Sequence, residues 1–271
     1  LLLKEDIIPS SADKPLFILA PFMIFIGAFI SFIAIPFGDS IIIADLNIGL
    51  FYILGVGSIA VLSLILAGWA SNNKWSLYGG MRSAAQIVSY EIPAGLSLIV
   101  VIMLAGTLNM QDIIAYQAGG MFNWIIFDNP FVPITFVVYF ISAIAETNRT
   151  PFDLPESESE LVAGFATEYS GMRYAFFFLS EYANMFVVSA VAAAGFLGGW
   201  HSPIAGFMDS SAWGVFWMVS KTFFLIFVMI WLRWTLPRLR VDQLMNVCWK
   251  VFLPLALINI FGVAIWTVVF N

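Results

Sequence analysis

The sequence has very few of the side chains that bind metals or form disulfides. Among its 271 residues there are one cysteine, Cys248, and one histidine, His201. A single cysteine excludes an internal disulfide and a cluster with several cysteine ligands, and a single histidine excludes haem bound by two histidines or a histidine-based zinc site. Redox or metal chemistry that accompanies this chain must therefore use ligands from elsewhere.

Charge is scarce as well. Only 10% of the residues are charged and 61% are hydrophobic, whereas soluble domains have about 25% charged and about 45–50% apolar residues. This composition excludes a soluble globular enzyme, and its apolar content excludes a disordered chain. The net charge of −6 argues against a nucleic-acid-binding protein. The sequence therefore predicts a membrane protein.

Long apolar runs dominate the sequence. A helix needs about 20 mostly apolar residues to cross a hydrocarbon core of about 30 Å. Seven runs approach this length: 16–37, 47–69, 91–109, 129–145, 174–197, 211–232 and 251–270. The expected fold class is an all-α polytopic membrane protein, with residues 1–271 forming a single transmembrane helical domain and an acidic loop over 146–173.

The basic residues predict the orientation of these spans. Ten of the eleven Lys and Arg residues lie before the first run or in the loops after the second, fourth and sixth runs, which would all be on the same side of the membrane. The eleventh, Lys221, lies inside a run. Because loops rich in Lys and Arg stay on the cytoplasmic or matrix side, we expect the C-terminus on the opposite side. Residue 1 is Leu rather than Met, so we also expect further sequence before it.

Three ionisable residues fall within the predicted spans, where each costs at least about 2.5 kcal/mol on insertion scales. Glu91 begins the third run, Glu181 lies about 10 Å into the fifth, and Lys221 is near the middle of the sixth. One interpretation is that Glu181 and Lys221 neutralise each other or cap broken helices. The other is a proton relay, since carboxylates change protonation state when their surroundings shift the pKa.

The loop 146–173 is unexpectedly acidic for the side that favours positive charge. It carries six carboxylates against two arginines: Glu146, Asp153, Glu156, Glu158, Glu160 and Glu168. A helix beginning at Pro155 would explain one or two acids in its first turn, but not six. Apolar residues are interleaved with the acids, so we expect a partly buried segment with carboxylates facing a cavity.

A glycine motif at 55–60, GVGSIA, matches the dinucleotide-binding pattern G-x-G-x-x-A. It lies inside an apolar run with no strand before it, which that nucleotide site requires. We interpret the glycines as small residues for close helix packing.

The segment AETNRTPFDLPESESELVAGFATEYSGMRYAFFFLSEYANM, 145–185, resembles the H subunit of NADH-quinone oxidoreductase, respiratory complex I, whose mitochondrial counterpart is NADH dehydrogenase subunit 1. Further similar stretches follow in the same order along nearly the whole chain, among them GWASNNKWSLYGGMRSAAQIVSYE and LPRLRVDQLMNVCWKVFLPL. The family has eight spans, so the resemblance implies that its N-terminal span and the loop after it, which form part of the quinone entrance, are absent here.

The resemblance implies a role between electron transfer and proton pumping. The expected substrate is quinone, which enters from the lipid bilayer, and this chain itself would bind no cofactor. Flavin mononucleotide and iron–sulfur clusters would belong to partner subunits of the peripheral arm, and further partners to the membrane arm. The expected location is a bacterial plasma (inner) membrane or a mitochondrial inner membrane, with the basic loops on the cytoplasmic or matrix side and no nucleic acid bound.

The resemblance also assigns residues to three groups. The quinone chamber and its coupling loop would include Lys4, Arg149, Asp153, Glu156, Glu158 and Glu160. The acidic path into the membrane would include Glu91, Glu146, Glu168 and Glu181, with Lys221 as their partner. Arg238, Arg240 and Asp242 would dock the peripheral arm, although basic residues there would also serve topology alone.

Three other functions stay open from the sequence. The related subunit of a membrane-bound hydrogenase or formate hydrogenlyase has a similar scaffold without quinone, although the intact ETNRTPFDLPE and TEYSG stretches favour the quinone enzyme. An independent ion or proton transporter would use buried Glu and Lys, but here the acids cluster in a loop rather than at mid-membrane. A purely structural anchor would not require the surplus acids.

Overall fold

The computed structural model describes residues 3–39, 41–153, 163–204, 206 and 210–270. The predicted chamber residues Glu156, Glu158 and Glu160 lie outside these described residues. The described part is helical and contains no β-strand, only an isolated bridge between Gly38 and Ile41. The predicted all-α fold class is confirmed.

Within the described ranges, six helices are long and apolar enough to cross a membrane. They are α1 (Lys14–Ser31, extended by the 3-10 turn η1, Phe32–Ala34), α2 (Gly49–Ala70), α3 (Lys74–Ala105), α8 (Gly171–Phe196), α9 (Ser211–Thr235), and the continuous unit of α10 (Val241–Val247), the π-helical turn η4 (Cys248–Phe252) and α11 (Leu253–Phe270). A seventh apolar helix, α6 (Val132–Glu146), has 15 residues. Short elements complete the described chain: α4 (Met110–Tyr116), η2 (Met121–Asn123), α5 (Ile125–Asp128) and η3 (Gly164–Ala166).

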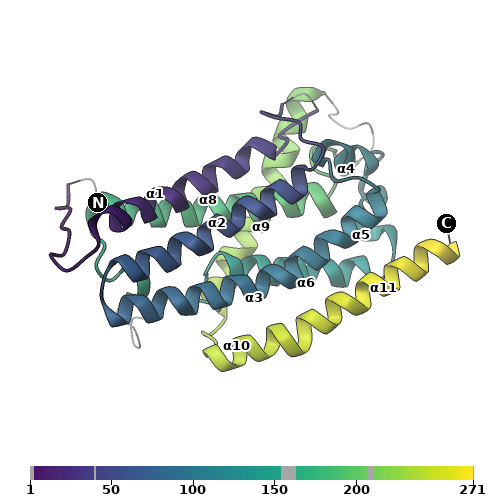
Figure 1. Cartoon of the computed structure of the whole chain (residues 1–271). Helices are drawn as coiled ribbons and strands as arrows, with labels where there is room; N and C mark the ends of the chain where they lie inside the picture. Colours follow the sequence, from purple (N-terminus) through teal and green to yellow (C-terminus); the bar gives the residue numbers. More distant parts are fainter. Residues whose placement is uncertain (1–2, 40, 154–162, 205, 207–209, 271) are drawn as a thin grey trace.

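Five helices form a closed ring. The contacts run from α1 to α2, α3, α6 and α8, and α8 returns to α1. Outside the ring, α9 packs on α8, while α11 packs on α3 and α6 (Figure 1). Only 22% of the α9 span and 17% of the α10–α11 span is buried, whereas half of α3 and of α8 is buried. The ring therefore encloses the interior, and the outer helices expose apolar side chains that suit lipid.

The two ends of the ring differ in charge. The basic end carries the segments 71–73, 147–153, 163–170 and 236–240, and the opposite end carries the segments 35–39, 41–48, 106–131 and 197–204. The N-terminal segment lies at the basic end and the C-terminus lies at the opposite end (Figure 1). This arrangement agrees with the alternation of loops inferred from the Lys and Arg residues.

Helix α3 begins 17 residues before the predicted start of the third span. Asn73 caps it, since its side chain accepts a hydrogen bond of 3.0 Å from the backbone N–H of Trp75. The added turns are polar and glycine-rich, so the hydropathy pattern concealed them. Their small residues allow close backbone approach: a Cβ on Gly79 would lie 2.5 Å from Cα of Gly164. The prediction that Glu91 begins this span is therefore wrong, because Glu91 lies in mid-helix.

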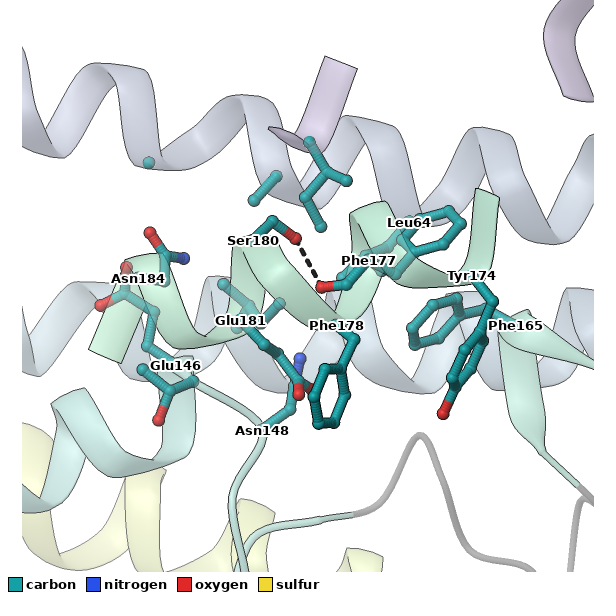
Figure 2. A pocket seen from close by; sticks show the side chains of 15 residues that line it. Leu64, Glu146, Asn148, Phe165, Tyr174, Phe177, Phe178, Ser180, Glu181 and Asn184 are labelled. Carbon is teal, nitrogen blue, oxygen red and sulfur yellow. Dashed lines mark hydrogen bonds between the residues drawn. The ribbon is translucent and has the colours of Figure 1, made fainter. Parts of the chain in front are cut away.

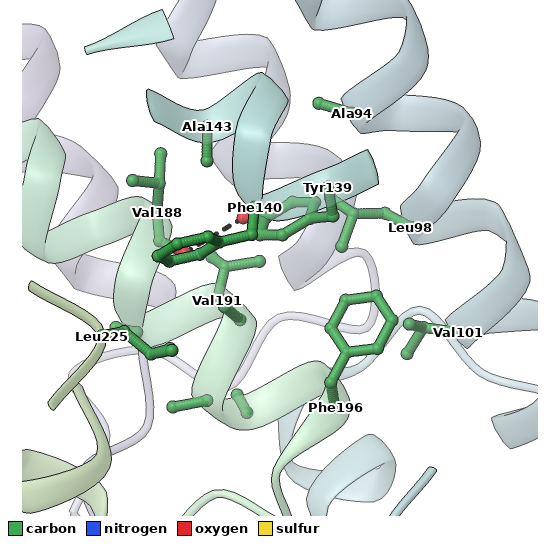
Figure 3. Close-up of a cluster of buried hydrophobic side chains, with 14 of the residues drawn as sticks. Ala94, Leu98, Val101, Tyr139, Phe140, Ala143, Val188, Val191, Phe196 and Leu225 are labelled. Atoms are coloured by element: carbon green, nitrogen blue, oxygen red, sulfur yellow. Dashed lines mark hydrogen bonds between the residues drawn. The ribbon is translucent and has the colours of Figure 1, made fainter. Parts of the chain in front are cut away.

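An apolar layer fills the ring between the middle and the opposite end. Tyr139 and Phe140 of α6 meet side chains of α3 and α8, and the Tyr139 hydroxyl donates a hydrogen bond of 3.1 Å to the carbonyl of Val188 (Figure 3). Further members shown there are Leu98, Val101, Val191 and Phe196. Buried side chains of this kind pack closely. Leu98, Tyr139 and Val191 of this layer also border a small cavity that reaches Glu146.

Candidate functional site

Glu146 is the last residue of α6, and its carboxylate lies over Gly57 of α2. A Cβ on Gly57 would lie 3.6 Å from Oε1 of Glu146, and no other heavy atom of the described residues would come within 4 Å of it. A Cβ on Gly55 would meet no described atom within 4 Å. The interpretation of this glycine motif as a close helix contact is therefore wrong. Gly57 instead leaves space for a carboxylate.

Two small cavities meet at Glu146. One of about 30 Å³ extends toward the basic end and is lined by Glu146, Glu181 and Asn184 together with aromatic side chains (Figure 2). The other, of about 20 Å³, extends toward Tyr139, and the two share Gly57, Glu146 and Asn184. Because about 10–15 Å³ is enough for one water molecule, each cavity has room for at least one. The carboxylates and Asn184 therefore line a connected polar space.

Glu91 lies beside this space. Its Oε1 accepts a hydrogen bond of 2.7 Å from the hydroxyl of Ser58 on α2, and its charge acts on Glu146. Helices α3 and α6 thus contribute two neighbouring acids, Glu91 and Glu146, and α2 contributes a hydroxyl that donates to the first of them.

Glu181 of α8 is the second acid that lines the cavity, and it pairs with Arg149. Oε2 of Glu181 lies 3.1 Å from Nη2 of Arg149, whose guanidinium stacks 4.4 Å from the centroid of the Tyr182 ring. The Arg149 side chain is only 8% exposed and that of Glu181 is 19% exposed. The pair therefore joins α8 to the loop that follows α6, beside the cavity.

Gln86 of α3 holds the loop that carries Arg149. Its amide nitrogen donates to the carbonyls of Ala145 and Phe152, at 2.8 and 2.7 Å, and to the Asn148 side chain at 3.3 Å. Asn148 adopts a φ of +52°, a left-handed conformation that Asn tolerates better than most residues. Sequence reasoning missed Gln86, because it lies in polar turns that were not predicted to be helical. It missed Asn184 because neutral polar residues within spans carry no charge signal.

Known proteins resemble this chain along nearly its whole length. The family model described as NADH dehydrogenase matches residues 1–264. The chain belongs to this family. It is similar to the H subunit of the NADH-quinone oxidoreductase of Chlorobaculum tepidum, with 55% identity over 99% of this chain and 77% of the relative. The same-named proteins of Geobacillus sp. and Anaeromyxobacter dehalogenans are 52% and 47% identical, over 98% and 99% of this chain and 77% and 69% of theirs. The resemblance inferred from the motifs is confirmed.

In this family member, Lys221 lies away from the acids. Its ammonium donates to the carbonyls of Leu197, Gly199 and His201 at 2.6, 2.9 and 2.7 Å, and lies 4.2 Å from the centroid of the Trp124 ring. Leu197 ends α8 about 24 Å beyond Glu181, by the rise of an α-helix. The structure therefore does not bring Lys221 together with Glu181, and mutual neutralisation of the two is wrong. The other part of that interpretation, a cap on a helix end, describes the observed contacts.

Glu168 and Lys4 lie at the basic end, outside the two cavities. Oε1 of Glu168 accepts a hydrogen bond of 2.7 Å from the side chain of Asn73, the residue that caps α3. Lys4 is exposed, and its neighbours attach to the start of α8: Asp6 lies 3.2 Å from Nε of Arg173. Next to Glu168, Tyr169 stacks on Phe17 at 4.1 Å, and burial raises the pKa of its hydroxyl, an effect that Arg173 partly opposes.

The residues expected to dock a peripheral arm divide into two kinds. Arg238 is used within the chain, since its Nη2 lies 3.5 Å from Oδ1 of Asp153, and Leu239 donates a backbone hydrogen bond of 3.0 Å to the carbonyl of Pro151. Arg240 and Asp242 are exposed at the start of α10. The segment 236–240 thus binds the loop after α6 through Arg238 and Leu239. Arg240 and Asp242 remain accessible to a partner.

Proposed function

We propose that this chain is the membrane subunit of a proton-translocating NADH:quinone oxidoreductase, and that it couples quinone reduction to proton movement. The observation that carries the proposal is the pair of connected cavities at Glu146 and Asn184, with Glu181 in the lining of one of them and Arg149 paired with Glu181. The relatives named as H subunits of NADH-quinone oxidoreductase point to the reaction. Reduction of quinone to quinol consumes two electrons and two protons.

The electrons would come from partner subunits. Flavin mononucleotide and iron–sulfur clusters held there would supply the redox chemistry, because a chain with one cysteine and one histidine has no ligand set for a cluster. This chain would supply the membrane side of the quinone chamber through Lys4, Arg149, Asp153 and the acidic segment that contains Glu156, Glu158 and Glu160. Quinone would enter from the lipid bilayer.

The Arg149–Glu181 pair would transmit the reaction into the membrane. Negative charge that forms near the loop attracts the guanidinium and weakens its hold on Glu181. A carboxylate that loses a cationic partner in a partly buried site gains affinity for a proton. Glu181 would then take up a proton and exchange it, through Asn184 and water in the cavity, with the Glu146 and Glu91 pair. Further subunits of the membrane arm would continue the path.

The orientation follows from the same proposal. The basic end would face the cytoplasm of a bacterium, in the plasma membrane, or the matrix of a mitochondrion, in the inner membrane. The peripheral arm would then bind at the basic end, on the side of the Arg149–Glu181 pair.

The test replaces Glu146 by Gln in the assembled enzyme and measures two reactions. NADH:ferricyanide reduction reports on the flavin of the partner subunits and on assembly, and NADH:quinone reduction reports on the coupled path. We expect the quinone reaction to fall about a hundredfold, within the range for removing a positioned proton-transfer group, or the number of protons moved per electron to decrease. The ferricyanide reaction should not change.

Asp112→Asn is the matched control, because it removes an exposed carboxylate on α4 at the opposite end. It should leave both reactions unchanged. If Glu146→Gln and Glu181→Gln both keep the full quinone rate and proton stoichiometry, the carboxylate cavity has no part in coupling and the proposal fails.

A further inference from the structure

A third cavity lies at the basic end, between α8 and α9 and outside the ring. Its volume is about 220 Å³, and its lining includes two guanidinium groups, Arg149 and Arg233, and the rings of Tyr182 and Trp234. Met185 and Met229 form part of its apolar floor. Amphipathic Tyr and Trp beside Arg are typical of the level of the lipid headgroups.

The charge of this cavity is not balanced. Arg149 is paired with Glu181, but Arg233 has no hydrogen-bond or ion-pair partner in the part of the chain that the structure describes. Among the described residues, no carboxylate lines the cavity itself. One positive charge is therefore available, and a guanidinium binds a phosphate group through two parallel hydrogen bonds.

An apolar stripe leads away from the cavity along α9. Phe223, Phe227, Ile230 and Trp234 recur at helical spacing and are between 41% and 82% exposed. The stripe is about 16 Å long by the rise of a helix, against a hydrocarbon core of about 30 Å. Among the described elements α9 packs mainly on α8, and the four side chains stay largely exposed although Phe223 also touches Phe186 of α8. An occupant of the cavity can therefore carry an acyl chain along α9.

We propose that this cavity binds the phosphate group of an anionic phospholipid, with one acyl chain along the stripe on α9. The headgroup phosphate contacts Arg233 and approaches Arg149 from the side away from Glu181. A free phosphate ion satisfies the same guanidinium but makes no use of the stripe. The proposal does not depend on the proposed function, although a lipid at Arg149 would act on the Arg149–Glu181 pair.

The test uses the assembled enzyme and a phosphatidylglycerol analogue with a diazirine on its acyl chain. After illumination, mass spectrometry measures labelling of the peptide that contains 223–234. We expect labelling in the native enzyme and about tenfold less in Arg233→Gln, as for loss of a charge-assisted contact. Arg233→Lys, which keeps the charge but not the planar fork, should give an intermediate result.

Lys250→Gln is the matched control, because it removes an exposed positive charge from η4 at the same end but away from the cavity. It should leave the labelling unchanged. Retention of the ferricyanide reaction in the purified enzyme verifies that each variant still assembles. Three results would overturn the proposal: equal labelling in Arg233→Gln, equal labelling by the zwitterionic phosphatidylcholine analogue, or displacement of the label by inorganic phosphate or a short-chain quinone.

Discussion

At the scale of single residues, Arg149 links the loop after α6 to helix α8. Its guanidinium is buried, stacks on Tyr182 and pairs with Glu181. Removing one partner of such a pair leaves a carboxylate in a poorly solvated site, which costs more than the pair itself contributes. This asymmetry makes the pair open to a direct test.

We predict that Arg149→Met destabilises the assembled subunit by about 3 kcal/mol, because Glu181 then lacks its cation. The double variant Arg149→Met with Glu181→Gln should recover most of that loss, since no charge is left unpaired. The measurement is the temperature at which the purified enzyme loses the subunit. Equal destabilisation in the single and double variants would show that packing of the long Arg149 side chain, not charge, holds the loop.

The same scale shows what the sequence reveals about the site. Glu91 and Glu181 were identified because an ionisable residue in an apolar run is costly and rare. Gln86 and Asn184 were not, because a neutral amide is ordinary in a membrane helix until its partners are known. The contact between Glu146 and Gly57 joins residues 89 positions apart, so no local pattern indicated it.

At the scale of helices and turns, glycines of α2 and α3 have opposite roles. Gly57 faces a cavity, where a Cβ would meet, among the described atoms, only a carboxylate oxygen at an ordinary 3.6 Å. Gly79 faces the backbone of Gly164 in η3, which a Cβ would approach to 2.5 Å. The first position is open for water, and the second is a packing contact between elements.

We predict that Gly57→Ala changes stability by no more than about 1 kcal/mol, since the added methyl group fits and Ala favours a helix. It should nevertheless lower proton-coupled quinone reduction, because the methyl group takes up part of the space beside Glu146 that has room for water. Gly79→Ala should cost roughly 3 kcal/mol, as overpacking does. The measurement compares the thermal stability and the coupled activity of the two variants. A Gly57→Ala enzyme with full coupling would show that the open space beside Gly57 is not needed.

Lys221 also connects separate elements, because it donates hydrogen bonds from α9 to the end of α8 and to the loop after it. Lys221→Met should lower stability by about 3 kcal/mol, since three carbonyls lose a charged donor. Particles that assemble should keep their proton stoichiometry, because the ammonium lies far from the carboxylates. Pumping measured per assembled particle decides this: loss of protons moved per electron without loss of stability would place Lys221 in the proton path instead.

At the scale of the whole molecule, composition was enough to predict an all-helical membrane protein, because long apolar runs are a strong signal. The ring was not predictable, since hydropathy shows which helices enter the membrane but not which of them touch. The start of α3 was misplaced because turns rich in Ser, Gly and Gln look like a loop. They are helical here because they pack against backbone, which a sequence profile does not show.

The charges at the start of α10 allow the proposed docking of a peripheral arm to be tested. Arg240 and Asp242 are exposed, whereas Arg238 is paired with Asp153. If Arg240 docks a peripheral arm through paired hydrogen bonds, Arg240→Lys weakens the arm although the positive charge that sets topology is kept. We predict that Arg240→Lys lowers the fraction of enzyme that retains its peripheral arm at high salt, and that Lys250→Arg does not. If both variants retain the arm as the native enzyme does, these basic residues serve topology alone, and the contact with the arm must lie on the loop that Arg238 fastens.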